Sequence, residues 1–286
     1  MATILETRYT QEYILDFARR KATLVDTVRR DTIDHGGALV FLIAGDGGAE
    51  VVTRGAFGKI PPADDNQTEV TVSLNEDISL VEKTRFNIFT ARASSQQTAL
   101  MRTNNMGKVH RSQDRRVINA IATGTQTLGA IATMDKQTAN KIAVTLANAD
   151  VGTEDDGNNI FAAVTNAAWA ELTDIASFAS ADYVHFGSES PVEAGLNMPG
   201  RFKNWMGINW TTHNGLPGKG TSAATCLAWH RNAVGYAMST NGIDAQIGYD
   251  GKEDTTWART TIFHGAVKLI NAGIVKWTHD DTGVLA

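Results

Sequence analysis

The stretch from Thr90 to Ala122 constrains the fold of this 286-residue chain more than any other feature. The chain has no proline between positions 63 and 190, and this stretch is rich in Ala, Gln, Met, Arg and Leu, which favour helices. Five side chains recur on one helical face: Met106, Val109, Gln113, Val117 and Ile121. A continuous helix of about 33 residues would span about 50 Å. Gly107, after two asparagines, is the candidate break. We therefore predict a rod-like helix across a flat or extended subunit.

Residues 37–84 are predicted to form a protruding β-hairpin. Leu39–Ile43 is an apolar run that ends at the turn signal Gly45–Gly48. Later, Val70, Val72 and Leu74 alternate with polar residues, as in a half-buried strand, and should share one face. Between the two strands lies a long tip rich in Gly, Pro and Asp, and long loops of this kind are usually functional or disordered.

The remaining chain has the pattern of an α/β region. Strands are expected at four places: Ile142–Leu146, Tyr183–Phe186, Cys226–Trp229 and Ile274–Trp277. Helices are expected over Ile160–Leu172, which is amphipathic, and near Ala233–Met238. Trp257–Leu269 is also amphipathic. At the other end, Leu5, Tyr9, Tyr13, Phe17 and Leu24 recur at roughly helical spacing, which indicates either a helix packed on its own domain or an arm that orders on a neighbour.

Opposite charges are concentrated in different segments. Residues 37–84 hold three basic and eight acidic residues, a net charge of -5, whereas residues 90–123 hold six basic residues and one acid, a net charge of +5. If copies of the chain pair with one another, such complementarity would set the register between them. Alternatively, the acidic and the basic segment could both be solvated faces. The candidate contact residues of the hairpin are Arg54, Lys59, Asp64, Asp65 and Glu69. Those of the N-terminal segment and long helix are Arg19, Arg20, Arg29, Arg30, Arg102, Lys108, Arg111, Arg115 and Arg116.

Searches for catalytic, metal and cofactor motifs give no candidate. Asn214–Ser222 resembles a phosphate loop, but Gly220 separates the lysine from the hydroxyl residue that should follow it directly. Cys226 is the only cysteine and lies in an apolar context, and the seven histidines show no metal spacing. Adjacent acidic pairs such as Asp280–Asp281 do not face one another. We therefore expect no enzyme activity, no cofactor and no metal.

Charge and hydropathy also argue against some classes of binding partner and cellular location. The net charge of -5 disfavours sequence-specific binding to duplex DNA, which usually relies on basic residues. No run of about 18 apolar residues indicates a membrane span. Acidic residues at Glu6, Glu12 and Asp16 argue against a signal peptide.

Several short motifs, in this order, resemble the major capsid proteins of tailed bacteriophages. They are Ser79–Thr84, Asn105–Arg111, Asp114–Ile121, Leu216–Gly218, Trp229–Gly235, Ile247–Asp250, Trp257–Thr260 and Gly265–Ala266. The resemblance implies an α+β chain with the Hong Kong 97-type capsid fold. It further implies an N-terminal arm at 1–36, an extended loop or E-loop at 37–84, a peripheral domain with the spine helix at 85–140, an axial domain at 141–254, and a return to the peripheral domain at 255–286.

By this resemblance, the chain is a virion protein that assembles in the host cytoplasm as hexamers and pentamers into an icosahedral head around double-stranded DNA. Its implied partners are other copies of itself, a separate scaffolding protein, a portal and a possible decoration protein, with only non-specific contact to packaged DNA. Lys59 is a candidate for the covalent cross-link known in one branch of the fold, and a solvated lysine is the alternative. An encapsulin-type compartment shell and a soluble α/β enzyme are the other functions considered.

Overall fold

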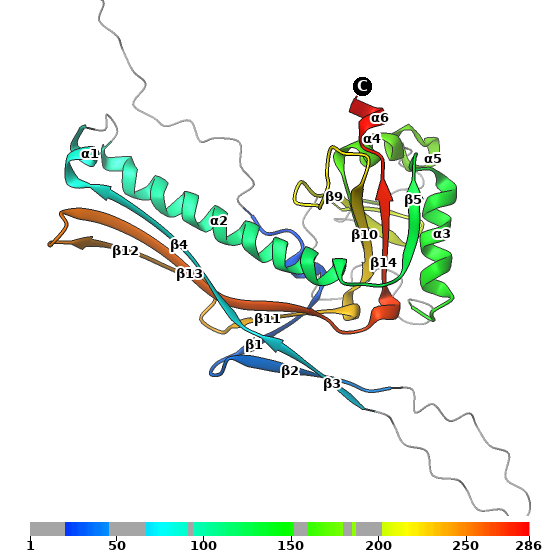
Figure 1. Cartoon of the computed structure of the whole chain (residues 1–286), viewed down its shortest axis with the longest axis horizontal. Helices are drawn as coiled ribbons and strands as arrows, with labels where there is room; N and C mark the ends of the chain where they lie inside the picture. Colours follow the sequence, from blue (N-terminus) through cyan, green and yellow to red (C-terminus); the bar gives the residue numbers. More distant parts are fainter. Residues whose placement is uncertain are drawn as a thin grey trace, which may run out of the picture. The chain divides into compact units, whose positions relative to one another are not determined.

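A computed structural model describes residues 21–45, 67–90, 94–151, 159–179, 185–186 and 202–285. The chain divides into two compact units (Figure 1). Unit 1 comprises Met1–Ala22, Glu76–Gln113 and Asn241–Phe263, and unit 2 comprises Thr23–Asn75, Asp114–Thr240 and His264–Ala286. The boundary falls inside the long helix and inside one long strand, so the chain passes from one unit to the other within regular elements.

Unit 1 is built from the long helix and three strands. The helices are α1 (Arg85–Thr90) and α2 (Ser94–Ala122), and the strands are β4 (Asn75–Thr84), β12 (Asp244–Asp250) and β13 (Thr255–Lys268). β12 pairs antiparallel with β13, from Asp244 opposite Thr261 to Asp250 opposite Thr255, and β4 also pairs with β13. Figure 1 shows α2 running alongside β4.

The predicted long helix is confirmed, but the break at Gly107 is wrong. α2 is continuous through Gly107, and Val109, Gln113, Val117 and Ile121 are buried as expected, with Met106 half-buried. A glycine within a helix costs only about 1 kcal/mol relative to alanine. Packing on both sides of Gly107, at Met101 and Val109, compensates for this cost.

Unit 2 contains a seven-stranded mixed sheet in the order β5-β14-β10-β6-β9-β8-β7. Its strands are β5 (Thr127–Ile131), β6 (Ile160–Val164), β7 (His185–Phe186), β8 (Lys203–Trp205), β9 (Ile208–Thr212), β10 (Ala224–His230) and β14 (Ile274–His279). Helices α3 (Lys136–Ala147), α4 (Asn166–Asp174) and α5 (Ala176–Ala179) supply the rest of one core. In that core Ile142, Leu146 and Leu172 meet Trp210 and Trp277, all almost fully buried.

A second group of strands in unit 2 holds the N-terminal part of the described chain. After the short 3-10 helix η1 (Val25–Thr27), β1 (Arg29–Ile33) pairs parallel with β11 (Val234–Ser239), and β11 pairs antiparallel with residues 264–268 of β13. β2 (Ala38–Ile43) and β3 (Thr68–Ser73) form a two-stranded ribbon. Two further 3-10 turns, η2 (Arg231–Ala233) and η3 (Asn271–Gly273), and the C-terminal helix α6 (Thr282–Leu285) complete the described elements.

Several predicted strands are confirmed. Leu39–Ile43 lies in β2, Cys226–Trp229 in β10 and Ile274–Trp277 in β14. Val70 and Val72 occupy the more buried face of β3, between the exposed Glu69, Thr71 and Ser73, so the predicted register is correct. His185 and Phe186 form β7, whereas the other two residues of that predicted strand lie outside the described residues.

Three element assignments are wrong. Ile142–Leu146 belongs to α3, which Asp135 caps by accepting a hydrogen bond from the backbone N–H of Thr138, and Ile142 and Leu146 then share its buried face. Ile160–Val164 is a central strand, and the helix begins only after the cap at Thr165. The Ala233–Met238 segment is mostly strand β11, because pairing with both β1 and β13 outweighs its helix propensity.

The amphipathic stretch Trp257–Leu269 is mostly strand β13. Gly265 marks its closest approach to another segment, because a Cβ there would lie 2.3 Å from the carbonyl oxygen of Ser73. Within the described ranges, no helix has the length and apolar character needed to cross a bilayer.

Candidate functional site

The predicted contact residues fall into four groups, the last of which lies on α2. Arg19, Arg20, Arg54, Lys59, Asp64 and Asp65 lie outside the described residues. Glu69 is exposed on β3, opposite Leu42 of β2. Arg29 and Arg30 are exposed on β1, and Arg30 forms an ion pair with Asp26 at 2.6 Å. Because both partners of that pair are about half exposed, it contributes little to stability.

The basic residues of α2 do not form one uniform surface. Arg102, Lys108 and Arg115 are exposed, whereas Arg111 and Arg116 are half-buried. In unit 2, Arg116 donates from Nε to Nε2 of His264 at 3.2 Å, and the other ring nitrogen of His264 lies 3.1 Å from the hydroxyl of Tyr236. Arg116 therefore has a structural role within its own subunit.

The N-terminal segment, for which the sequence leaves open packing on its own domain or on a neighbour, packs within its own subunit at residues 23–28. Leu24 and Val28 are fully buried in unit 2, and the Trp229 indole N–H donates to the Thr27 carbonyl at 3.2 Å. The side chain of Asp114 accepts hydrogen bonds from the backbone N–H groups of Thr23 and Leu24, the latter at 2.9 Å. Asp114, which the sequence shows only as the single acid in a basic helix, thus anchors the chain where it enters unit 2.

His213 completes this anchor. Its Nε2 lies 3.6 Å from a carboxylate oxygen of Asp114, and its Nδ1 accepts a hydrogen bond from the Gly215 N–H at 2.9 Å. Both side chains are almost fully buried. Position 215 requires glycine, since a Cβ there would lie 2.8 Å from the His213 ring.

The ribbon formed by β2 and β3 exposes apolar side chains on one face. On its inner face Phe41 and Val72 pack against Ala237 and are almost fully buried. On its outer face, Val40 and Leu42 are 47% and 71% exposed. We call Val40, Leu42, Glu69 and Thr71 the ribbon face. An isolated two-stranded ribbon is only marginally stable in water. Packing of its inner face on the rest of unit 2 therefore holds the ribbon in place.

In unit 1, α2 covers one face of the sheet through polar contacts. Asn105 accepts a hydrogen bond from Ser79 at 2.9 Å and donates one to the Ala258 carbonyl at 2.7 Å. Lys83 donates to Gln97 at 2.5 Å, and Ser112 donates to Asp77. Two charged residues of the acidic segment, Asp77 and Lys83, therefore already have polar partners on α2 within one subunit.

The alternate residues of the same strands are exposed. Ile78 and Leu80 on β4 and Phe263 on β13 are each about half exposed, and Arg259 on β13 is also exposed, with its guanidinium 5.9 Å from the ring of Trp257. We call Ile78, Leu80, Arg259 and Phe263 the open sheet face. Neighbouring apolar side chains on one sheet face are typical of a surface that another protein covers.

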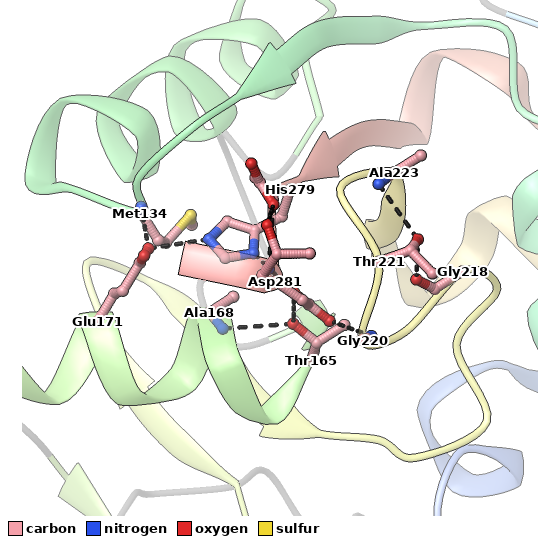
Figure 2. Close-up of polar contacts among 12 residues, drawn as sticks. Met134, Thr165, Ala168, Glu171, Gly218, Gly220, Thr221, Ala223, His279 and Asp281 are labelled. Carbon is pink, nitrogen blue, oxygen red and sulfur yellow. Dashed lines mark hydrogen bonds and ion pairs between the residues drawn. The ribbon is translucent and has the colours of Figure 1, made fainter. Parts of the chain in front are cut away.

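A buried polar cluster lies at the end of β14 in unit 2 (Figure 2). His279 is fully buried, with Nδ1 2.8 Å from Oδ1 of Asp281 and Nε2 2.9 Å from Oε2 of Glu171. Asp281 also accepts from the Thr165 hydroxyl at 2.7 Å and from the Gly220 N–H at 2.8 Å. We call Glu171, His279 and Asp281 the histidine cluster.

The surroundings of this cluster set the charge of Asp281. Burial by itself would raise the pKa of Asp281, but the hydrogen bonds from Gly220, Thr165 and His279 outweigh it and hold the pKa below its usual value. Burial raises the pKa of the nearby Cys226 thiol to about 12, which makes this cysteine unreactive at neutral pH.

Sequence reasoning missed the histidine cluster. The sequence analysis considers Asp280–Asp281 only as an adjacent acidic pair, although His279 and Asp281 are two residues apart and could share a side of the chain. The position of Glu171 beside them depends on how α4 packs on β14, which no local pattern encodes. Across the described ranges, no group of three or more His, Cys, Asp or Glu side chains is arranged to hold a metal ion.

Solved structures of phage and capsid proteins share the fold of this chain. The chain is similar to the capsid of cyanophage P-SCSP1u, with 13% identity and a TM-score of 0.69 over 96% of this chain and 93% of that one. It is similarly related to a chain of Mycobacterium phage Che8, with 14% identity and a TM-score of 0.70 over 97% of this chain and 98% of that one. The capsid of a native GTA particle gives 12% identity and a TM-score of 0.68, with 96% of each chain covered.

These likenesses confirm the Hong Kong 97-type capsid fold. A sequence profile described as phage capsid protein matches residues 2–281. The chain therefore belongs to the phage capsid protein family and is a structural subunit of a virion capsid. A search of curated proteins gave no match. The family match does not favour the compartment-shell or soluble-enzyme alternatives.

Proposed function

We propose that this protein is the subunit that assembles as hexamers and pentamers into an icosahedral phage head around double-stranded DNA. The observation that carries this proposal is the family match over residues 2–281, together with a likeness to capsid structures over almost the whole chain. A closed shell repeats each contact between copies many times, so weak individual contacts suffice for a stable particle.

The division into functional parts is also proposed. Residues 1–36 serve as the N-terminal arm and 37–84 as the E-loop, while 85–140 with 255–286 form the peripheral domain and 141–254 the axial domain. The exposed Val40 and Leu42 of the ribbon face support an E-loop that packs on a neighbouring copy. Within each copy, the buried anchor at Asp114 supports an arm that is fixed at residues 23 and 24.

Charged contacts between copies are proposed for the candidate residues of the two oppositely charged segments and the N-terminal segment. On the acidic side these are Asp64, Asp65 and Glu69 with their neighbours Arg54 and Lys59, and on the basic side Arg19, Arg20, Arg29, Arg30, Arg102, Lys108, Arg111 and Arg115. Arg116, which binds His264, is a weaker candidate. Such contacts steer assembly and set register more than they add affinity.

Other partners are proposed on functional grounds. A head that packages DNA needs a portal, and a separate scaffolding protein would set its size, with decoration proteins optional. Contact with DNA is non-specific, since the chain carries a net charge of -5. The protein acts as a structural component rather than as an enzyme.

Electron microscopy and sedimentation of the purified chain, with and without its scaffolding protein, test the proposal. We expect large hollow particles. A chain that stays monomeric at high concentration under both conditions would contradict it. For the charged contacts, reversal of Asp64, Asp65 and Glu69 to lysine should impair assembly while leaving the circular dichroism of the subunit unchanged. Asp174→Lys, at an exposed acid on α4, is the control and should assemble normally.

A further inference from the structure

Asp114 lies one turn before Val117 and Ile118 on the buried face of α2, and its own side chain is fully buried. A carboxyl group among apolar side chains is costly unless hydrogen bonds satisfy it. Its oxygens accept from the backbone N–H of Thr23 at 3.1 and 3.2 Å and from that of Leu24 at 2.9 Å. We propose that Asp114 is a positioning residue for assembly, which sets the direction in which the arm leaves the subunit and thereby keeps the shells uniform.

Two different kinds of contact hold the segment from Thr23 to Val28. Leu24 and Val28 are fully buried, and apolar burial holds a segment in place without fixing its direction. The hydrogen bonds to Asp114 are directional, because an N–H group must point at its acceptor. Two consecutive amides that point at one carboxyl group therefore fix the orientation of the backbone at Thr23 and Leu24, which burial alone would not do.

The chain that follows Leu24 is held by other groups. Thr27 donates from its backbone N–H and its hydroxyl to the Leu24 carbonyl, at 3.0 and 2.7 Å, and its own carbonyl accepts from the Trp229 indole N–H at 3.2 Å. Residues 29–33 then pair with β11. Asp114 binds the N-terminal end of this segment, where the chain enters unit 2. Loss of the Asp114 side chain should therefore act on the direction of the arm before it acts on the rest of the segment.

The direction of the arm matters because a closed shell repeats the same few contact geometries between its copies. An arm that leaves each copy at one fixed angle meets the same surface of a neighbour every time, whereas an arm with several exit angles must lose that freedom at each contact. This inference rests on the proposed function, since the arm has this role only when copies assemble. The expected consequence of losing Asp114 is therefore an error in the geometry of the shell, with the subunit still folded.

Hydrogen exchange tests the geometry in the full-length subunit. In the unmodified chain, the amides of Thr23 and Leu24 should exchange at least about 100-fold more slowly than in an unstructured peptide, and no protection at either amide would overturn the proposal. In Asp114→Ala both should exchange at least about tenfold faster, whereas the amide of Leu227, in the central strand β10, should not change. Asp34→Ala, at an exposed acid, is the matched control and should leave all three amides unchanged. Equal acceleration at Leu227 in Asp114→Ala would refute a local role.

Electron microscopy of assembled particles tests the consequence for the shell. Asp114→Ala should give at least about a threefold larger share of misshapen or open particles than the unmodified chain, and Asp114→Asn, which keeps one acceptor oxygen, should fall between the two. Leu146→Ala, at a fully buried position on α3, weakens unit 2 elsewhere and should give fewer but equally uniform particles. Uniform closed particles from Asp114→Ala, or none at all, would refute the role of Asp114 and leave the proposed function standing. Absence of particles from the unmodified chain would instead contradict the proposed function.

Discussion

Unit 1 and unit 2 cover the faces of their β-sheets in different ways. In unit 2, helices and strands enclose an aromatic core in which Phe178, Trp205 and Trp210 contact one another, with ring centroids 5.3 and 6.3 Å apart. In unit 1, a single helix covers one face of the sheet through polar contacts such as Ser79–Asn105, and the other face exposes Ile78, Leu80 and Phe263. Unit 2 therefore encloses an aromatic core of its own, although its ribbon face also exposes Val40 and Leu42, whereas unit 1 leaves a whole face of its sheet with exposed apolar side chains.

The comparison predicts that core mutations in unit 2 have the largest effect on stability. Trp210 is fully buried and its indole N–H donates to the Trp205 carbonyl at 3.2 Å. Trp210→Ala should lower the free energy of unfolding by about 3–5 kcal/mol, because it leaves a large cavity and an unpaired carbonyl. Urea denaturation followed by fluorescence measures this. A loss below about 1 kcal/mol would contradict the view of unit 2 as a tightly packed core.

Asp281→Asn should have the next largest effect, and it should depend on pH. Since the pKa of Asp281 is lowered in the folded state, its contribution is present above the pKa of the unfolded chain and is lost as the pH falls through the folded value. At pH 7 the substitution should cost about 2–4 kcal/mol, because it removes a buried carboxylate that accepts hydrogen bonds from Thr165 and Gly220. Below about pH 4 the difference from the unmodified chain should shrink. Denaturation curves at several pH values test this, and a constant difference would exclude the mechanism.

Asn105→Ala probes the polar packing of unit 1. The change leaves the buried hydroxyl of Ser79 and the carbonyl of Ala258 without this partner, so we expect a loss of about 1–3 kcal/mol. The neighbouring Asn104→Ala, at an exposed position, is the matched control and should stay within about 0.5 kcal/mol of the unmodified chain. Equal effects of the two changes would show that polar contacts do not hold α2 on its sheet.

Substitutions on the exposed faces should affect stability least. Leu42→Ser on the ribbon face and Leu80→Ser on the open sheet face should each change the unfolding free energy of the subunit by less than about 0.5 kcal/mol. Both should nevertheless reduce the yield of assembled particles, since they remove apolar surface that a neighbouring copy would cover. Thr173→Ser, at an exposed position on α4, is the control for assembly. Normal particle yields from both variants would mean that neither face is an interface.

Local patterns correctly predicted the elements whose intrinsic preference for helix or strand agrees with the structure that their packing partners require. The helix-forming residues from Thr90 onward predicted α2. The alternation at Val70 and Val72 predicted which face of β3 packs on the rest of unit 2. The order of the short motifs resembles that of the family to which the chain belongs. The contact residues were less predictable from the sequence. Among the proposed charged contacts, Arg116 binds His264 within its own subunit, and six other residues lie outside the described ranges.

The sequence by itself determined the long helix, the ribbon strands, the opposite charges of two segments and membership of the capsid family. Only the tertiary structure decided that Ile142–Leu146 is helical, that Ile160–Val164 and Val234–Ser239 are strands, and that His279 meets Glu171 across 108 residues. The physical reason is that short apolar runs suit a buried helix and a buried strand equally well, so the choice depends on pairing and capping partners. A buried polar cluster likewise depends on which distant segments share a core.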